Sequence, residues 1–333
     1  MQGEMKSHKE LNQKTGGFTL TELLVAMLLA ALVITPLLTF MLNIMDTERK
    51  EQAKATSEQE LQSALDYIAR DLEQAVYIYD DDGLMRNNSA TPADSGIKDQ
   101  IPPAAPAPGC NASSKCQPVL VFWKREYNNK VVPLSITNNY CTSSPSSCND
   151  TFVYSLVGYY LIKDNDATWS KAARIGRFQI QDGVRAPNNS GTLSYLPTNG
   201  PSNGFELFNL SLTGNSFKVK MNKWKKKNGQ IYTNQTVVLL DYIDQSTDGV
   251  PQVACPAGTR AVPPYDSAAI NNIFKTYSFY ACVDSTRTLA QVYLRGNALA
   301  RIKDGVLTYS ASNSAYFPQA SIQVKGRGFL EPK

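Results

Sequence analysis

An uncharged run of 23 residues, 23–45, constrains this chain more than any other part of its sequence. As a helix the run would measure about 35 Å, and the hydrocarbon core of a bilayer is about 30 Å thick. Nothing after Asp46 approaches this length without a charge. The sequence therefore predicts one membrane span, followed by a single domain long enough to bury a core of its own.

The first seventeen residues are polar and carry three lysines against two glutamates. A positive flank stays on the cytoplasmic side of a membrane, so the chain beyond the span is predicted to be exported. The small pair Gly16-Gly17 stands before the apolar run, whereas a secretory signal peptide is cut after its apolar region. The net charge of +4 is too small to indicate a partner.

All six cysteines lie beyond the span, on the side predicted to be exported. An oxidising compartment favours disulfides there. Zinc is a poor alternative because no C-x-x-C pair occurs and the only histidine is His8. We therefore expect neither a metal nor another cofactor. Neighbours in the sequence form the simplest pairs, although other connectivities stay open: Cys110–Cys116, Cys141–Cys148 and Cys255–Cys282.

Residues 18 to about 79 contain no glycine and a single proline, Pro36, which predicts one long helix. Its exported part, 46–79, is amphipathic and should pack on the exported domain through an apolar stripe. Asp71 is assigned mostly to the polar face, and the acidic turn 80–83 is expected to end the helix. The stripe consists of Leu61, Ala64, Leu65, Ile68, Leu72, Ala75 and Val76.

The exported domain, 80–333, begins with a proline-rich surface loop at 102–109. Short runs rich in β-branched and aromatic residues follow, separated by Asn, Ser, Gly and Pro. A long helix followed by strands predicts an α+β fold in which an antiparallel β-sheet packs on the helix. The predicted strands are 119–123, 151–162, 173–180, 205–210, 236–243, 277–283 and 291–301.

The segment GGFTLTELLVAM, residues 16–27, resembles the type IV prepilin motif. In that family a dedicated prepilin peptidase cuts after a glycine and methylates the new N-terminal phenylalanine. The resemblance implies a leader at 1–17, cleavage after Gly17, N-methylation of Phe18 and a role for Glu22 in subunit assembly. An ordinary signal anchor with a coincidental glutamate is the alternative.

Glu22 is informative on physical grounds as well, because a carboxylate in an apolar span costs about 2.5–3.5 kcal/mol on insertion scales. It therefore needs a partner, and the sequence offers none nearby. The next cation available within the membrane is the amino group of another subunit, and pairing with it would set the register of a polymer. This is also the role that the resemblance implies.

The stretch ALDYIARDLEQAVYIYD is similar to the PilW/PulJ group of minor pilins and pseudopilins. Two later segments, ARIGRFQIQDGV and QVYLRGNALARI, are similar to the hormogonium polysaccharide secretion pseudopilins of cyanobacteria, of the HpsC type. These resemblances imply a structural subunit of a type IV pilus-like apparatus that serves polysaccharide secretion and gliding motility. The alternatives are a type II secretion pseudopilin and an anchored adhesin that never polymerises.

The resemblance also implies a division of the chain and a set of partners. The leader 1–17 precedes a transmembrane and polymerisation helix, 18–45, its amphipathic extension, 46–79, and the disulfide-bonded domain, 80–333. The subunit would cross the inner membrane once with its domain in the periplasm, and would reach the cell surface or a pilus after assembly. Its partners would be prepilin peptidase, other pilins, the assembly platform and membrane lipid.

One basic segment of the exported domain is concentrated and contains aromatic residues. Charge and stacking could hold an acidic polysaccharide there, whereas a nucleic acid partner is not expected. The simpler interpretation is an exposed hairpin tip that ends at Asn228-Gly229. The segment comprises Lys218, Lys220, Lys223, Trp224, Lys225, Lys226 and Lys227.

An enzyme is not predicted. The chain after His8 has no histidine, no glycine-rich phosphate loop and no nucleophile signature. A glycosidase built on two carboxylates is the formal alternative. The acidic turn 80–83 offers oxygen atoms to calcium but lacks the ligand spacing of a calcium-binding loop, so a polar turn is favoured.

We predict that the chain is cut between Gly17 and Phe18 and that the mature protein begins with N-methyl-phenylalanine. Glycine has no side chain, and a peptidase pocket shaped for it would accept nothing larger. Mass spectrometry of the N-terminal peptide measures both modifications, with cells that lack the peptidase as the uncut control. A chain that still begins at Met1 in cells with active peptidase would contradict this prediction.

Overall fold

The computed structural model of this chain forms two compact units, Met1–Arg49 and Lys50–Lys333. The second unit is called the head below. Residues 1–15, which make up most of the predicted leader, lie outside the described residues. The structure describes residues 16–134, 141, 148–188, 190–212, 216–252, 254–303 and 307–328.

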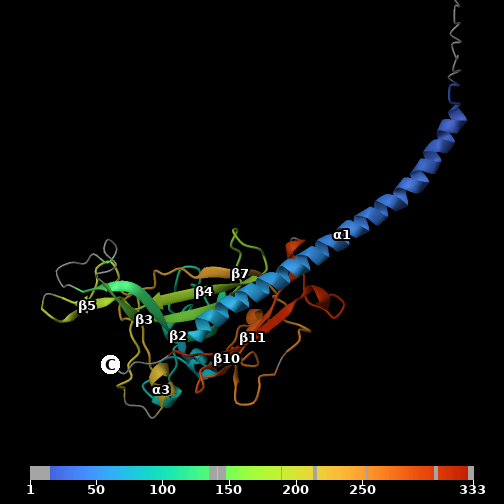
Figure 1. Ribbon diagram of the computed structural model, residues 1–333. Coiled ribbons are helices and arrows are strands. Elements are labelled where there is room, and N and C mark those ends of the chain that lie inside the picture. The colour runs from blue at the N-terminus through green and yellow to red at the C-terminus, as the bar shows by residue number, and fades with distance from the viewer. Residues whose placement is uncertain are drawn as a thin grey trace, which may run out of the picture. The chain divides into compact units, whose positions relative to one another are not determined.

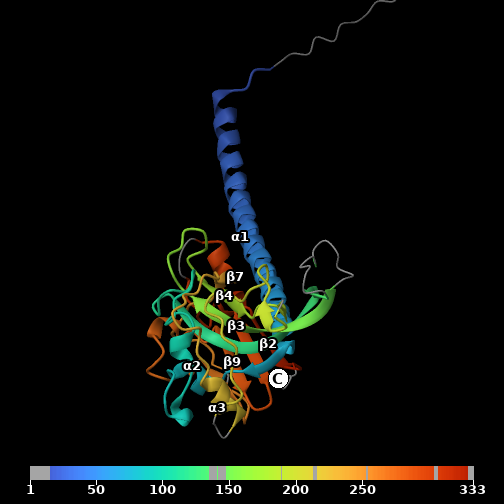
Figure 2. The same cartoon turned by 90° about the vertical axis from the view of Figure 1, so that its left-hand side faces the viewer.

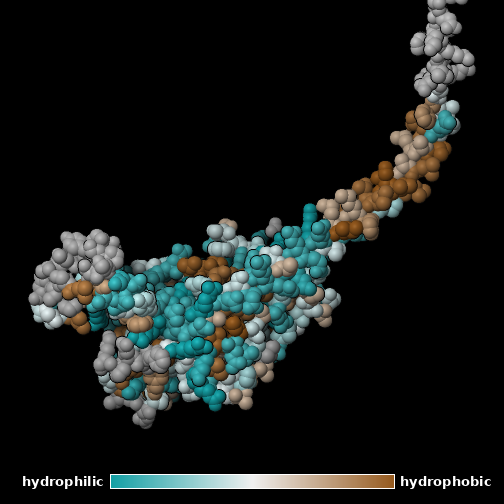
Figure 3. Space-filling view, in the orientation of Figure 1, coloured by the Kyte–Doolittle hydropathy of each residue, from teal (hydrophilic) through white to brown (hydrophobic). Residues whose placement is uncertain are grey.

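Helix α1 (Leu20–Glu73) starts with an apolar part whose side chains are exposed on every side. By length and composition it is the one helix among the described residues that could cross a membrane. It continues through Pro36. The hydroxyls of Thr35 and Thr39 donate to carbonyl oxygens one turn earlier, at 2.8 and 3.0 Å, which satisfies both in an apolar setting. Figure 3 shows hydrophobic residues gathered on this part of α1.

The later part of α1 packs on the head through the predicted stripe. Leu61, Leu65 and Ile68 are at most 2% exposed and join one continuous core with residues of the strands. Figures 1 and 2 show this part of the helix beside the sheet that contains β2, β3 and β4. The predicted packing of an amphipathic helix on an antiparallel sheet is therefore confirmed, up to residue 73.

The helix ends at Glu73, and its predicted extension to about residue 79 is wrong. Strand β1 (Ala75–Ile78) follows at once, fully buried and paired antiparallel with β2 (Cys116–Pro133). Valine, tyrosine and isoleucine suit a pleated strand, and β2 supplies the hydrogen bonds. The backbone N–H of Arg327 donates to the carbonyl of Glu73 at 2.9 Å, which satisfies one acceptor at the helix end.

Two antiparallel sheets form the framework of the head, which confirms the α+β class. The larger sheet has the strand order β1-β2-β3-β4-β7, and the smaller one has the order β11-β10-β9-β8. The further strands of the larger sheet are β3 (Cys148–Ile162), β4 (Ala173–Gln181) and β7 (Val237–Ile243). The smaller sheet consists of β8 (Arg260–Val262), β9 (Phe279–Asp284), β10 (Leu289–Arg295) and β11 (Gln319–Lys325).

Short elements connect these strands. A separate ribbon pairs β5 (Arg185–Pro187) with β6 (Leu193–Tyr195), and α2 (Asp81–Met85) and α3 (Phe217–Asn222) are short α-helices. The 3-10 turns are η1 (Pro92–Asp94), η2 (Lys98–Gln100), η4 (Asn272–Phe274), η5 (Ala298–Arg301) and η6 (Ser314–Tyr316).

Six of the seven predicted strands coincide with β2, β3, β4, β7, β9 and β10, although β10 stops at Arg295 and η5 follows. The strand predicted at 205–210 is wrong, because that segment has no strand structure. Its Phe205 and Phe208 pack edge-on against Trp123, with ring centroids 5.9 and 5.0 Å apart. Aromatic packing, and not a place in a sheet, buries these two rings.

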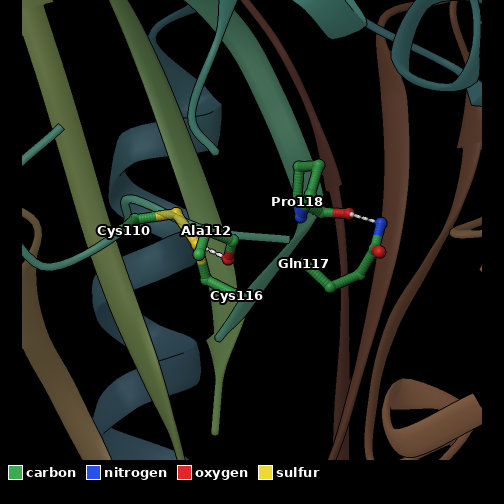
Figure 4. Close-up of a disulfide and its surroundings, with 5 residues drawn as sticks. All are labelled: Cys110, Ala112, Cys116, Gln117 and Pro118. Atoms are coloured by element: carbon green, nitrogen blue, oxygen red, sulfur yellow. Dashed lines mark hydrogen bonds between the residues drawn. A yellow bond between two sulfur atoms is a disulfide. The ribbon is translucent and has the colours of Figure 1, made fainter. Parts of the chain in front are cut away.

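Three disulfides join cysteines that are neighbours in the sequence, and they attach irregular loops to strands. The first closes a loop at the start of β2, where the Gln117 amide donates to the Pro118 carbonyl at 3.2 Å (Figure 4). The third attaches the loop at residue 255 to a buried position on β9. The pairs are Cys110–Cys116, Cys141–Cys148 and Cys255–Cys282.

A buried carboxylate near the end of α1 connects the helix to three strands. Asp71 accepts hydrogen bonds from Lys124 of β2 at 2.9 Å, from Arg177 of β4 at 2.7 Å and from the Tyr159 hydroxyl of β3 at 2.6 Å. Burial opposes its ionisation, but these donors outweigh burial and hold the pKa of Asp71 below its ordinary value. The predicted position of Asp71 on the polar face is therefore wrong.

Replacing Asp71 by asparagine is expected to destabilise the head by on the order of 3 kcal/mol, because Arg177 loses its carboxylate partner and the buried Lys124 keeps only Glu126. Guanidinium unfolding of the full-length protein in detergent, followed by near-UV circular dichroism, measures the free energy of unfolding. Asp66→Asn, on the exposed face of the same helix, is the matched control and should change it by less than about 0.5 kcal/mol.

The same pair of proteins gives a pH test. Because folding lowers the pKa of Asp71, its stabilisation is present above the ordinary value of 3.8 and is lost as the pH falls through the folded-state pKa. The advantage of the wild type over D71N should therefore shrink below pH 3.8. Equal stability of the two proteins at neutral pH would contradict the role of Asp71.

Candidate functional site

Helix α1 begins with reciprocal hydrogen bonds between Thr19 and Glu22. The backbone N–H and the hydroxyl of Thr19 donate to Glu22 Oε2 at 3.0 and 2.8 Å, and the Glu22 N–H donates to Thr19 Oγ1 at 3.3 Å. This arrangement is a capping box, in which a threonine before the first turn pairs with a glutamate three residues later. It satisfies backbone donors that a helix leaves unpaired at its start.

The expectation that Glu22 has no partner in its own chain is wrong, because Thr19 is that partner. The spacing Thr-x-x-Glu was readable in the sequence and is the signal that would have identified it. Both bonds from Thr19 end on Oε2, and Oε1 accepts no hydrogen bond from the described residues. A donor from another molecule could therefore bind Oε1 without opening the cap.

The predicted cleavage position lies in open chain before the helix. Gly16 and Gly17 are exposed and have no regular structure, and Phe18 is 84% exposed. A Cβ atom built on either glycine would meet no other atom within 4 Å. The bond between Gly17 and Phe18 is thus sterically accessible, with the Thr19–Glu22 cap directly after it.

A comparison with protein families finds a match that covers this segment. The family described as the prokaryotic N-terminal methylation motif matches residues 12–38, which include the Gly17–Phe18 bond, the cap and the first part of α1. The same helix packs on antiparallel sheets further along. The motif and the long helix that follows it are those of type IV pilins and pseudopilins. No curated protein and no solved structure matches this pilin-like chain.

The methylation motif implies that this pilin-like subunit is processed by prepilin peptidase and handled by the pilus machinery. Its apolar helix anchors the subunit in a membrane before assembly. Proteins of this family generally serve as structural subunits and not as catalysts.

The basic segment of this pilin-like chain is not the hairpin tip that its sequence suggests. Residues Phe217–Asn222 form α3, and Trp224 follows with only 2% of its surface exposed. The Trp224 indole N–H donates to the carbonyl of Glu206 at 2.7 Å, and its ring lies 5.5 Å from that of Trp123. Trp224 is therefore a core residue and cannot stack on a polymer in solvent.

The lysines of the basic segment are also engaged within the head. Lys218 Nζ lies 2.5 Å from an Asp80 oxygen, Lys220 Nζ donates to a backbone carbonyl at 2.8 Å, and Lys227 pairs with Glu206 at 3.2 Å. Lys226 Nζ donates to the carbonyl of Gln230. Within the described ranges, the side chains of Lys223 and Lys225 have no such partner. Internal contacts thus use much of the charge that the polyanion hypothesis needs.

The acidic turn provides the partners of these cations. It starts helix α2, because Asp80 accepts the Gly83 N–H at 3.3 Å as an N-cap. The carboxylates of residues 80–82 lie within 4.8 Å of one another. Arg260 approaches Asp81 to 2.7 Å, while Asp82 meets Lys218 at 2.8 Å and also pairs with Arg86 and Arg260. These ion pairs join β8 and α3 to the turn and explain why the acidic residues cluster.

Replacing Glu22 by valine should leave membrane insertion unchanged or improved, because a carboxylate leaves the apolar segment. Incorporation into filaments should fall by about tenfold or more, the equivalent of ~1.4 kcal/mol, because a contact between subunits is lost. Quantitative immunoblots of the sheared surface fraction and of the membrane fraction measure the ratio.

Thr19→Val is the matched control, since it removes the hydroxyl that Glu22 uses locally but keeps the carboxylate. If a contact with another subunit matters, T19V should assemble nearly as the wild type does, and Glu22→Gln should fail as E22V does. Equal assembly of the wild type and E22V would contradict the assembly role of Glu22.

Proposed function

We propose that this chain is a minor pilin or pseudopilin of the PilW/PulJ group, a non-catalytic subunit of a type IV pilus-like apparatus that serves polysaccharide secretion and gliding motility. The observation that carries the proposal is the methylation motif at residues 12–38, placed at the start of an apolar helix. The stretch that resembles the PilW/PulJ group forms the end of α1 and strand β1.

In this proposal the peptidase removes residues 1–17 and methylates Phe18, which leaves a cationic amino group at the start of the helix. Oε1 of Glu22 in a neighbouring subunit has room for that cation, while Thr19 holds Oε2. Pairing the two would turn the cost of a carboxylate in lipid into a fixed register between subunits. Residues 18–45 would then be the polymerisation helix.

We further propose that the subunit crosses the inner membrane once, with its head in the periplasm, and that assembly carries the head to the cell surface or a pilus. The three disulfides, all within the head, support this placement because such bonds persist in oxidising compartments. The participation of other pilins and of the assembly platform belongs to the same proposal.

The link to polysaccharide depends on the two later segments that resemble cyanobacterial secretion pseudopilins. ARIGRFQIQDGV forms β4 and the chain after it, and QVYLRGNALARI forms most of β10 together with η5. These segments therefore belong to the framework of both sheets. An acidic polysaccharide was the expected contact of the basic segment, but the internal ion pairs of Lys218 and Lys227 leave that segment a weak candidate.

An in-frame deletion of the gene is expected to reduce both gliding and lectin-stained extracellular polysaccharide to a small fraction of wild-type levels, while secretion of folded proteins continues. The wild-type gene should restore both and the E22V gene should not. Wild-type levels of both traits in the deletion strain would contradict the proposal. Loss of protein secretion with normal polysaccharide would identify a type II secretion pseudopilin, and full rescue by E22V would identify an anchored adhesin.

A further inference from the structure

The head contains an open cleft of about 740 Å³. The cleft lies between the later part of α1, the loop before β4 and strand β7, all within the head. Two aromatic side chains in its lining are well exposed, Trp169 at 40% and Tyr67 at 42%. The other two tryptophans of the chain, Trp123 and Trp224, are buried in the core.

A backbone irregularity brings a third aromatic ring to the cleft. The pairing of β4 with β7 steps from Ala173↔Ile243 to Ile175↔Leu240, so β7 contains one extra residue. Such a bulge redirects side chains, and bulges are frequent beside functional sites. Tyr242 lies in this bulge with a φ of 58°, the left-handed region that residues other than glycine rarely adopt. Its side chain lines the cleft.

Polar contacts hold the walls of the cleft in place. Asp241 accepts hydrogen bonds from the backbone N–H and the hydroxyl of Ser170 at 2.9 and 2.8 Å, which fixes the loop that carries Trp169. The Arg301 guanidinium lies 4.2 Å from the centre of the Tyr242 ring. Arg301 also donates to Ser57 of α1 at 2.9 Å and pairs with a glutamate one turn later. The aromatic groups are thus presented by anchored elements.

The lining indicates the chemistry of a ligand. Flat aromatic rings pack well against the C–H faces of sugar rings, and the carboxylates, guanidinium groups and hydroxyls at the walls suit the hydrogen bonds of sugar hydroxyls. Two carboxylates, Glu60 and Asp241, balance two guanidinium groups, Arg70 and Arg301. Because the cleft carries no excess of positive charge, it does not favour a polyanion.

We propose that this cleft binds a short segment of a neutral saccharide chain, with sugar rings stacked on Trp169 and Tyr67. This proposal rests on the proposed function, because the saccharide would come from the polymer that the apparatus exports. It extends that function by naming where on the head the polymer binds. In this proposal the head binds polysaccharide in the cleft and not at the basic segment.

The test uses the full-length mature protein in a zwitterionic detergent, because sugar-headed detergents would compete for the cleft. The probes are neutral oligosaccharides, released by partial hydrolysis from the extracellular polysaccharide of cells that make this chain. Calorimetry and tryptophan fluorescence should show saturable binding, and Trp169 should supply the spectral change because the other two tryptophans are buried. The affinity should be nearly the same at low and high salt.

Matched variants separate the cleft from the rest of the surface. Trp169→Ala and Tyr67→Ala should each weaken binding by about tenfold, while Trp169→Phe should keep part of the affinity. Tyr127→Ala removes an aromatic side chain that is 55% exposed on β2 and does not line the cleft, and it should bind as the wild type does. Circular dichroism confirms that each variant is folded.

The absence of saturable binding by the folded wild type, or equal affinity of W169A, would overturn this inference. Filament incorporation lost in W169A without any saccharide binding would overturn it too, and would identify a second copy of the chain as the occupant. These results are separate from the deletion test. Normal polysaccharide in the deletion strain would end the proposed function, even if the cleft bound saccharide in solution.

Discussion

The ion cluster around Asp71 fixes the position of α1 on the head. Its carboxylate meets Lys124, Tyr159 and Arg177, which come from three adjacent strands. Desolvating these charges is costly, and the contacts offset that cost only when every donor reaches the carboxylate. Sliding the helix by one turn, about 5.4 Å, would take the carboxylate away from Arg177 and leave the buried Lys124 with Glu126 alone. The apolar stripe discriminates less between alternative positions of the helix along the sheet, because apolar contacts are not directional. The cluster therefore sets the register, and the stripe supplies most of the buried area.

The two carboxylates in apolar surroundings on α1, Glu22 and Asp71, differ in how completely the chain satisfies them. Donors of the same molecule occupy both oxygens of Asp71, as expected for a contact that a folded subunit makes once. Thr19 occupies only one oxygen of Glu22. The first arrangement is complete in one molecule. The second leaves an acceptor in an apolar segment that no described residue satisfies, and this difference supports the proposed intersubunit role of Glu22.

The features that were predictable from the sequence are those set by local patterns. A long uncharged run identified the span, helical periodicity identified the stripe from Leu61 to Leu72, and runs rich in β-branched and aromatic residues identified six strands. The order of helix and strands gave the fold class. What failed depends on distant contacts. Residues 74–79 could continue a helix by their own preferences, but β2 converts them to a strand. Lys218 lies 136 residues from its partner Asp82, and no spacing rule connects them. The Thr19–Glu22 cap is the opposite case, a local signal that was available.

The charge balance within the head affects which kind of polymer the head can bind. An acidic chain approaching Lys218 would have to displace Asp80 and Asp82, which already lie within 2.8 Å of its ammonium group. Exchanging these ion pairs for new ones would add little binding free energy, whereas a lysine without an internal partner would contribute the full free energy of its new ion pair. A neutral saccharide faces no such competition, because its stacking on an exposed ring displaces only water. The internal ion pairs of the basic segment, together with the exposed aromatic rings of the cleft, therefore favour contact with uncharged sugar over contact with a polyanion.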